Sequence, residues 1–210
     1  NSRHTPTLYN VGYYRQWYWD GRATTLEGQV LAAWKGQMGA DPEKIVATLN
    51  GIEGYKNAFQ QAMGGPATPE RVSQALASFL RTIKSENAPW DRYEQGDKTA
   101  VPPEVIAGFE VFTSTRRANC TLCHLPPLYS DTLFHNVGVG YDKPKPDPGR
   151  GKILADLAKE KGVEDETAAA MMGAFKTPTL RGVIESGPFF HDGHAATLED
   201  AVDFMLKGGI

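Results

Sequence analysis

Cys120-Thr121-Leu122-Cys123-His124 is the stretch that decides the fold, and it holds the only two cysteines among 210 residues. Two thiols at this spacing can add across the two vinyl groups of a haem, and the imidazole that follows can then reach the iron as an axial ligand. We therefore predict one covalently attached c-type haem, held by Cys120, Cys123 and His124. Part of the core would then be a cofactor rather than side chains.

Three other interpretations of this motif are weaker. A structural zinc site needs four ligands, and the sequence has no second cysteine pair to complete one. A thioredoxin-like redox pair would lie near a βαβ pattern, which the sequence lacks, and a simple disulfide would not need the histidine that follows. Because haem attachment of this kind implies export, we expect an oxidising compartment such as the periplasm of a Gram-negative bacterium.

Helical spacing recurs along the chain, whereas strand-like alternation is almost absent. A capping residue followed by proline, or a pair of prolines, predicts helix starts at Asp41, Thr68 and Pro102. The clearest helix follows Thr68, and we expect its apolar stripe to face a core. The stripe consists of Val72, Ala75, Leu76, Phe79, Leu80 and Ile83.

Two more helices are predicted, one over residues 26–38 and one after Thr197. Thr197 and Asp200 together resemble a capping box at the start of the second helix. Between the helices lie two long segments, residues 126–150 and 175–196. Loops longer than about 12–15 residues are uncommon unless they are functional. We therefore expect an all-α fold with long loops, which suits a protein whose core is partly a cofactor.

Composition and charge exclude two classes of partner. The formal net charge is −3 and the isoelectric point is about 6.0, so nothing favours nucleic acid as a ligand. No stretch approaches the roughly 20 apolar residues that span a bilayer, and we expect no membrane span.

The first residues show no signal peptide, so we expect a chain that begins as a mature protein or lacks its beginning. A stretch rich in Pro, Gly and charge, residues 94–103, predicts a domain boundary.

Three blocks of sequence carry a family resemblance. The first is RHTPTLYN (3–10) with WDGRATTLEGQ (19–29). The second runs through ALASF (75–79), DRY (91–93), GD (96–97), the cysteine motif, YSD (129–131) and FHNVG (134–138). The third is FKTPTLR (175–181), PFFHDG (188–193) and TLE (197–199). Taken together and in order, over nearly the whole chain, they resemble the bacterial di-haem cytochrome c peroxidase family, which includes the methylamine-utilisation di-haem oxidases.

The resemblance implies class I cytochrome c-like haem domains. Residues 1–97 correspond to the later part of an N-terminal peroxidatic haem domain, whose own haem motif would lie upstream of Asn1. Residues 98–210 correspond to the C-terminal cytochrome c domain, which carries the electron-transfer haem. We therefore expect one haem c attached within this chain and a second one upstream. A protein with a single haem is the alternative.

The resemblance also assigns the second axial ligand of the haem at His124. Met205 lies fourteen residues after His191, at the position of the family's methionine ligand. From the residues alone, a core methionine on the apolar face of the last helix is the simpler interpretation. Because the methylamine-utilisation branch has a tyrosine at this position, Met205 favours the peroxidase branch. Trp19 corresponds to a tryptophan between the two haems, with a packed aromatic residue as the alternative.

The peroxide-binding side departs from the family in one residue. Gln29 corresponds to a glutamine of the family's distal pocket. Gln37 stands nearest to the glutamate that acts as general acid–base, and an amide can orient peroxide but cannot transfer its proton. The resemblance therefore implies either slow O–O heterolysis or transfer of the role to Glu43, the next acid downstream. The alternative for Glu43 is a solvated residue favoured by the helix dipole.

The family also usually holds a calcium ion between its domains, with an asparagine side chain and two backbone carbonyls. The carbonyl positions correspond to Ser186 and Pro188. The asparagine position falls on His4, whose imidazole is a poor ligand for a hard cation. For His135 and His191 the resemblance favours contacts around the haem or its propionates over iron ligation, with a plain structural role as the alternative.

Three functions remain open from the sequence. The resemblance implies reduction of hydrogen peroxide to water, with electrons from a small periplasmic cytochrome or cupredoxin. A second hypothesis is a di-haem oxidase that modifies a side chain on a partner protein, and the loss of the distal glutamate favours it. The third is a mono-haem electron-transfer cytochrome. The oligomeric state stays open, with a homodimer among the options.

Overall fold

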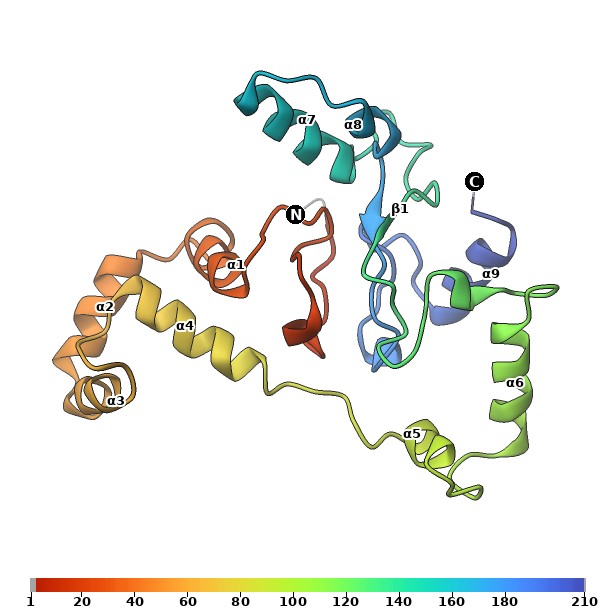
Figure 1. The fold of residues 1–210 in the computed structure, drawn as a ribbon, viewed down its shortest axis with the longest axis horizontal. Helices are drawn as coiled ribbons and strands as arrows, with labels where there is room; N and C mark the ends of the chain where they lie inside the picture. The colour runs from red at the N-terminus through yellow and green to blue at the C-terminus, as the bar shows by residue number, and fades with distance from the viewer. Residues whose placement is uncertain (1–2, 210) are drawn as a thin grey trace. The chain divides into compact units, whose positions relative to one another are not determined.

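The computed structural model describes residues 3–209, and this part of the chain is mostly helical (Figure 1). In chain order its helical elements are η1 (Val11–Tyr13), α1 (Leu26–Ala32), η2 (Ala33–Gln37), α2 (Pro42–Gly51), α3 (Glu53–Met63), α4 (Pro69–Leu80), α5 (Pro89–Glu94), α6 (Pro103–Thr113), η3 (Cys120–Leu122), α7 (Gly149–Lys161), α8 (Glu166–Ala170), η4 (Val183–Glu185) and α9 (Leu198–Leu206). Two short strands, β1 (Phe134–His135) and β2 (Phe175–Lys176), accompany them. None of the described helices has the length and apolar character needed to cross a membrane. The expectation of a mostly helical protein is confirmed.

The chain divides into two compact units. The helical unit comprises residues 11–18 and 22–83, and the cysteine unit comprises residues 3–10, 19–21 and 84–209. The division falls at residue 83, ahead of the stretch 94–103 that the composition marks as a boundary. The assignment of residues 1–97 to the later part of an N-terminal haem domain stays a prediction.

In the helical unit, α4 packs against α1 and α2. Each of these three helices begins at a side-chain cap: Thr25 accepts from the Gly28 amide, Asp41 from those of Glu43 and Lys44, and Thr68 from that of Arg71. Such caps satisfy amide groups that the first helical turn leaves unpaired, and each contributes about 0.5–2 kcal/mol. The predicted helix starts at Asp41 and Thr68 are confirmed.

Two apolar clusters hold the helical unit together. One consists of Val11, Trp17, Leu26 and Ala77, and the other of Trp34, Val46, Ala67 and Val72. The predicted stripe of α4 is only partly correct, because Leu76 and Phe79 are exposed while Val72 and Ala77 are buried. Periodicity showed that the helix is amphipathic, but the packing on α1 and α2 selects which apolar residues are covered.

The helix predicted over residues 26–38 changes character in its second half. The α-helical hydrogen bonding ends at Ala32, and residues Ala33–Gln37 form a π-helical turn in which the Met38 amide donates to the Ala33 carbonyl. Turns of this kind are rare and occur often at functional sites.

In the cysteine unit, β1 and β2 form an antiparallel pair in which Phe134 lies opposite Lys176 and His135 opposite Phe175. This pair joins the FHNVG and FKTPTLR blocks, which are far apart in the sequence. The segment between them carries α7 and α8, which pack against each other (Figure 1). Helices α3, α5, α7 and α8 were not predicted from the sequence pattern.

The N-terminal segment belongs to the cysteine unit because Arg3 binds two carboxylates. Its guanidinium lies 2.6–2.7 Å from Asp147 and also contacts Asp20. Arg150 donates to the carbonyls of Asp20 and Gly21 at 3.2 and 3.1 Å. Gly21 has φ +70°, and a Cβ there would overlap the Phe134 ring. Only glycine therefore fits this close approach without strain.

Candidate functional site

The cysteine motif forms a single short helical turn. Asn119, in the left-handed region with φ +50°, leads into η3, and the His124 amide donates to the Cys120 carbonyl at 2.9 Å. Both cysteine side chains are half-buried, and burial raises the pKa of each thiol. The turn thus gathers two thiols and one imidazole within five residues.

His124 is held in one tautomer by the backbone. Its Nδ1 lies 2.9 Å from the Tyr129 carbonyl oxygen, and because a carbonyl only accepts, Nδ1 carries the proton. Burial lowers the pKa of His124, which favours the neutral ring. The lone pair on Nε2 is then available to a metal, and the hydrogen bond at Nδ1 fixes the orientation of the ring.

Two hydrogen bonds, which we call the threonine clasp, fix the loop that provides this carbonyl. The Thr179 hydroxyl donates to the Leu128 carbonyl at 2.6 Å, and the Ser130 hydroxyl donates to the Thr177 carbonyl at 2.7 Å. Thr179, Thr177 and Ser130 are all buried. The segment after β2 therefore positions His124 through the backbone of residues 128–130. We did not predict this role, although Thr179 and Ser130, whose hydroxyl groups make these bonds, stand in the FKTPTLR and YSD blocks.

Arg181 ties the same loop to α5. Its Nε donates to the Pro127 carbonyl at 2.6 Å, and its two Nη atoms lie 2.7 and 2.9 Å from the carboxylate of Asp91. The two side chains are only 13% and 12% exposed. The guanidinium lowers the pKa of Asp91. Both residues stand in family blocks of the sequence, but their pairing was not predicted.

An acid–histidine pair lies beside Cys123. Asp131 accepts from His135 at 2.7 Å, and its amide donates to the Cys123 carbonyl at 2.7 Å. Among residues 3–209, Cys123, Asp131 and His135 are the one group of three potential metal-binding side chains that lie close together. With the Cys123 sulfur used in a thioether, two ligands would remain, so this group is not a complete metal site.

His191 is a packed residue. It is buried, and its ring stacks on Phe175 with 3.6 Å between centroids. Burial lowers the pKa of His191. Its carbonyl accepts from the His4 amide at 2.6 Å.

Met205 lies near the end of α9, which begins at the predicted capping box. Thr197 and Asp200 exchange side chain-to-amide hydrogen bonds of 3.1 and 3.2 Å. Ala201 is buried, whereas Met205 is 44% exposed. Met205 is thus not enclosed in a core of described residues. Thiols, a neutral imidazole and a thioether are the donors that a c-type haem uses, so the residues of the cysteine unit fit this group.

Trp19 is fixed at both its ring and its backbone. The indole Nε1 donates to the His4 carbonyl at 2.8 Å, and the Trp19 carbonyl accepts from the Lys176 amide at 2.8 Å. Lys176 is itself buried, which lowers its pKa to about 8 despite the opposing charge of Asp20. Trp17, in contrast, is a buried residue of the helical unit and donates to the Val11 carbonyl.

If Trp19 lies between two haems, as the family resemblance implies, replacing it with phenylalanine should slow electron transfer between them in the full-length protein. The smaller ring keeps most of the apolar volume but loses the bond to His4, so we expect a stability cost of about 1–2 kcal/mol. Rapid-mixing spectroscopy and denaturant unfolding measure the two effects. Trp17→Phe, at a similar stability cost, should leave the electron-transfer rate unchanged. An unaltered rate in folded Trp19→Phe would show that the residue only packs.

The predicted peroxide-side residues lie in the helical unit. Gln29 is half-buried in α1, and its carbonyl accepts from the Tyr18 hydroxyl at 3.3 Å. Gln37 is exposed at the end of the π-helical turn, and Glu43 is exposed in the first turn of α2. The amide of Glu43 donates to the cap residue Asp41 at 3.1 Å.

The predicted calcium residues lie in the cysteine unit. Ser186 follows η4, and its carbonyl oxygen lies 3.0 Å from Nε2 of His4. Pro188 is exposed after a cis peptide bond with Gly187.

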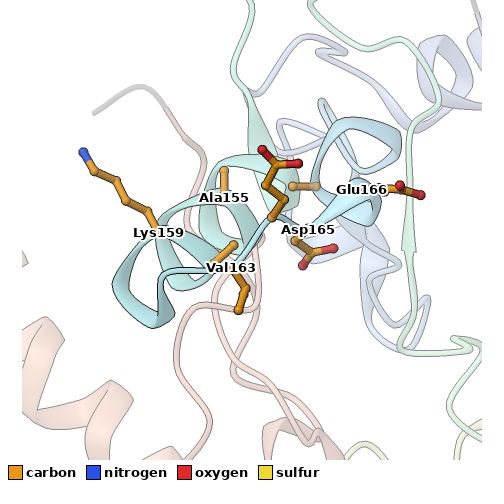
Figure 2. Close-up of a pocket in the computed structure, with 8 residues that line it drawn as sticks. Ala155, Lys159, Val163, Asp165 and Glu166 are labelled. Carbon is orange, nitrogen blue, oxygen red and sulfur yellow. The ribbon is translucent and has the colours of Figure 1, made fainter.

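A hollow of about 500 Å³ lies elsewhere, between α7 and α8 (Figure 2). Its walls include Ala155, Lys159 and Val163 on one side and Asp165 and Glu166 on the other. It is open to solvent, and none of its lining residues belongs to the predicted site.

Known proteins resemble this chain as follows. The sequence model of a family described as di-haem cytochrome c peroxidase matches residues 1–99. Methylamine utilization protein MauG of Methylophilus methylotrophus is 38% identical over 206 residues, which cover 96% of this chain and 57% of that protein. Cytochrome-c peroxidase IdrP1 of Denitromonas iodatirespirans is 32% identical over 233 residues, which cover 99% of this chain and 60% of that protein.

The fold agrees with these sequence matches. The crystal structure of a MauG-like protein associated with microbial copper homeostasis superposes with a TM-score of 0.79 at 26% identity, over 100% of this chain and 64% of that one. The chain therefore spans less than two thirds of the length of each of these relatives.

Proposed function

This chain belongs to the di-haem cytochrome c peroxidase family, and on that premise we propose that it is part of an enzyme that reduces hydrogen peroxide to water. The observation that carries the proposal is the arrangement at His124, where two thiols lie next to a neutral imidazole whose Nδ1 is held by the Tyr129 carbonyl. We place the protein in the periplasm, with a small cytochrome or cupredoxin as its electron donor.

Four residues of the cysteine unit would hold a c-type haem in a class I cytochrome c-like domain. Cys120 and Cys123 supply the sulfur atoms for covalent attachment, and Nε2 of His124 and the sulfur of Met205 are the proposed iron ligands. Iron ligated in this way supplies one-electron redox chemistry, with a reduction potential that the methionine raises. The threonine clasp keeps the imidazole in its orientation, and Trp19 is the proposed link to a second haem attached upstream.

The helical unit would form the later part of the peroxidatic domain. There the amides of Gln29 and Gln37 can donate hydrogen bonds that orient peroxide. Neither amide can move a proton between the two oxygens. Either O–O heterolysis is therefore slow, or another group transfers the proton, with Glu43 as the alternative in this chain.

Replacing Met205 with alanine is expected to abolish the ferric methionine–iron charge-transfer band. The reduction potential should fall by on the order of 0.1 V, because axial ligands set haem potentials over a range of about 0.8 V. Absorption spectroscopy and a redox titration of the full-length protein measure both. Met172→Ala is the matched control, since Met172 lies in the same unit and is 46% exposed against 44% for Met205. An unchanged spectrum would mean that another side chain holds the sixth position.

Two measurements on the full-length protein test the function itself. A pyridine haemochrome assay should give two haems per chain, whereas one haem would indicate an electron-transfer cytochrome. Peroxide turnover should oxidise reduced cytochrome c in a fixed ratio to the peroxide consumed. A di-haem protein that does not turn over with either class of small donor would contradict peroxidase function.

The second candidate is a di-haem oxidase that modifies a side chain on a partner protein. It is supported by the 38% identity to MauG, which exceeds the 32% identity to the peroxidase IdrP1, and by Gln37 in place of an acid. Met205 in place of tyrosine argues against it. Peroxide-driven oxidation of a partner protein, seen by mass spectrometry in the absence of any external donor, would distinguish this function from the first.

A further inference from the structure

His4 makes three hydrogen bonds that connect distant parts of the cysteine unit. Its amide donates to the His191 carbonyl at 2.6 Å, and its carbonyl accepts from the Trp19 indole at 2.8 Å. Its side-chain Nε2 lies 3.0 Å from the Ser186 carbonyl oxygen. One residue thus joins the N-terminal segment to the Trp19 segment, to the loop after η4 and to the PFFHDG block.

The side-chain bond has a fixed direction. A carbonyl oxygen only accepts, so Nε2 of His4 must carry the proton and point it at Ser186. The Ser186 hydroxyl is also engaged, since it donates to the Val183 carbonyl at 2.8 Å. The N–H group of His4 takes up one of the two lone pairs of the Ser186 carbonyl, and the imidazole stands where a cation at this corner, between His4 and residues 186–188, would need an oxygen ligand.

The donor set at this corner does not fit calcium. Calcium takes six to eight oxygen ligands, usually with carboxylates among them. His4 offers nitrogen in place of oxygen, and the adjacent acid, Glu185, is exposed.

We propose that His4 replaces a bound cation at this corner with a hydrogen bond, so that the packing of Trp19 and the loop at Ser186 does not depend on calcium. The imidazole donor satisfies the Ser186 carbonyl directly, while the backbone of His4 holds Trp19 and His191. This role of His4 lies in the assembly of the cysteine unit and is independent of the proposed peroxidase activity.

The test compares the thermal unfolding of the full-length, haem-loaded protein in excess calcium and in excess chelator. The wild-type midpoint is expected to differ by less than about 1 °C between the two conditions, and calorimetric titration with calcium chloride should show no binding at this corner. In His4→Asn, which supplies an amide oxygen, the midpoint should rise with calcium by about 5 °C or more at a hundredfold excess over Kd.

His4→Phe is the matched variant, because it keeps a flat ring but removes the donor. Its unfolding midpoint should fall by about 2–6 °C, equally with calcium and with chelator. A wild-type protein that calcium stabilises, and that loses this response in His4→Phe, would overturn the proposal. So would a His4→Phe protein as stable as the wild type, since His4 would then not hold the corner.

Discussion

Restoring an acid with Gln37→Glu is expected to raise the rate of reaction with hydrogen peroxide at least about tenfold. Heterolysis of the O–O bond needs a group that moves a proton from the inner to the outer oxygen, and such general acid–base help is typically worth ~10²–10⁴ in rate. Gln37 ends the π-helical turn and is exposed, so a carboxylate there would be easily accommodated. Stopped-flow mixing of the full-length protein with peroxide measures the rate.

Glu43→Gln is the companion variant and should change that rate little. Glu43 is exposed in the first turn of α2, where its amide is held by Asp41 and its charge is favoured by the helix dipole. If Glu43→Gln slowed the reaction and Gln37→Glu had no effect, Glu43 would be the proton-transfer group. If neither variant altered the rate, the catalytic group would lie outside both positions.

Replacing Arg181 with alanine is expected to destabilise the cysteine unit by about 2–4 kcal/mol. The change leaves the nearly buried carboxylate of Asp91 without its partner and removes the donor to the Pro127 carbonyl. Denaturant unfolding of the haem-loaded protein measures the loss. Hydrogen exchange should also quicken in residues 125–131, because the loop that holds His124 loses its anchor.

Two further variants separate geometry from charge. Arg181→Lys keeps the charge but not the planar fork, so it should recover only part of the lost stability. Arg92→Ala removes an exposed arginine from the same helix as Asp91, and should stay within about 0.5 kcal/mol of the wild type. A fully stable Arg181→Ala protein would show that the ion pair does not hold α5 to the loop.

Local chemistry explains which parts of the fold the sequence could predict. Asp41, Thr68 and Thr197 were identified as helix starts because a cap and its amide lie within three residues. Helix α7 begins after Pro148 without a side-chain cap hydrogen bond, and α8 was missed although the side chain of its cap residue Asp165 accepts from the Thr167 amide. The burial pattern of α4 could not be derived from periodicity, since α1 and α2 determine which side is covered.

In the candidate site, too, the local features could be predicted from the sequence and the long-range contacts could not. The cysteine motif is contiguous, so its chemistry can be read from five consecutive residues. Ser130 and Thr177 are 47 residues apart, and Asp91 and Arg181 are 90 apart, so no local pattern links them. Several of these bonds also end on backbone carbonyls, which every residue type has and which therefore leave no mark in the sequence.

The hydrogen bond from His124 to Tyr129 has a consequence for how this protein can evolve. The acceptor is a main-chain oxygen, so no substitution at position 129 can delete it. What mutation can change is the path of the chain, because Tyr129 has φ +52°, a region that β-branched residues avoid and that glycine or asparagine enters easily. Substitution at residue 129 is therefore limited by this conformation and by the contacts of its ring with Phe112 and Arg181. The orientation of the imidazole depends equally on the hydroxyl groups of Ser130 and Thr179, which hold the loop in shape.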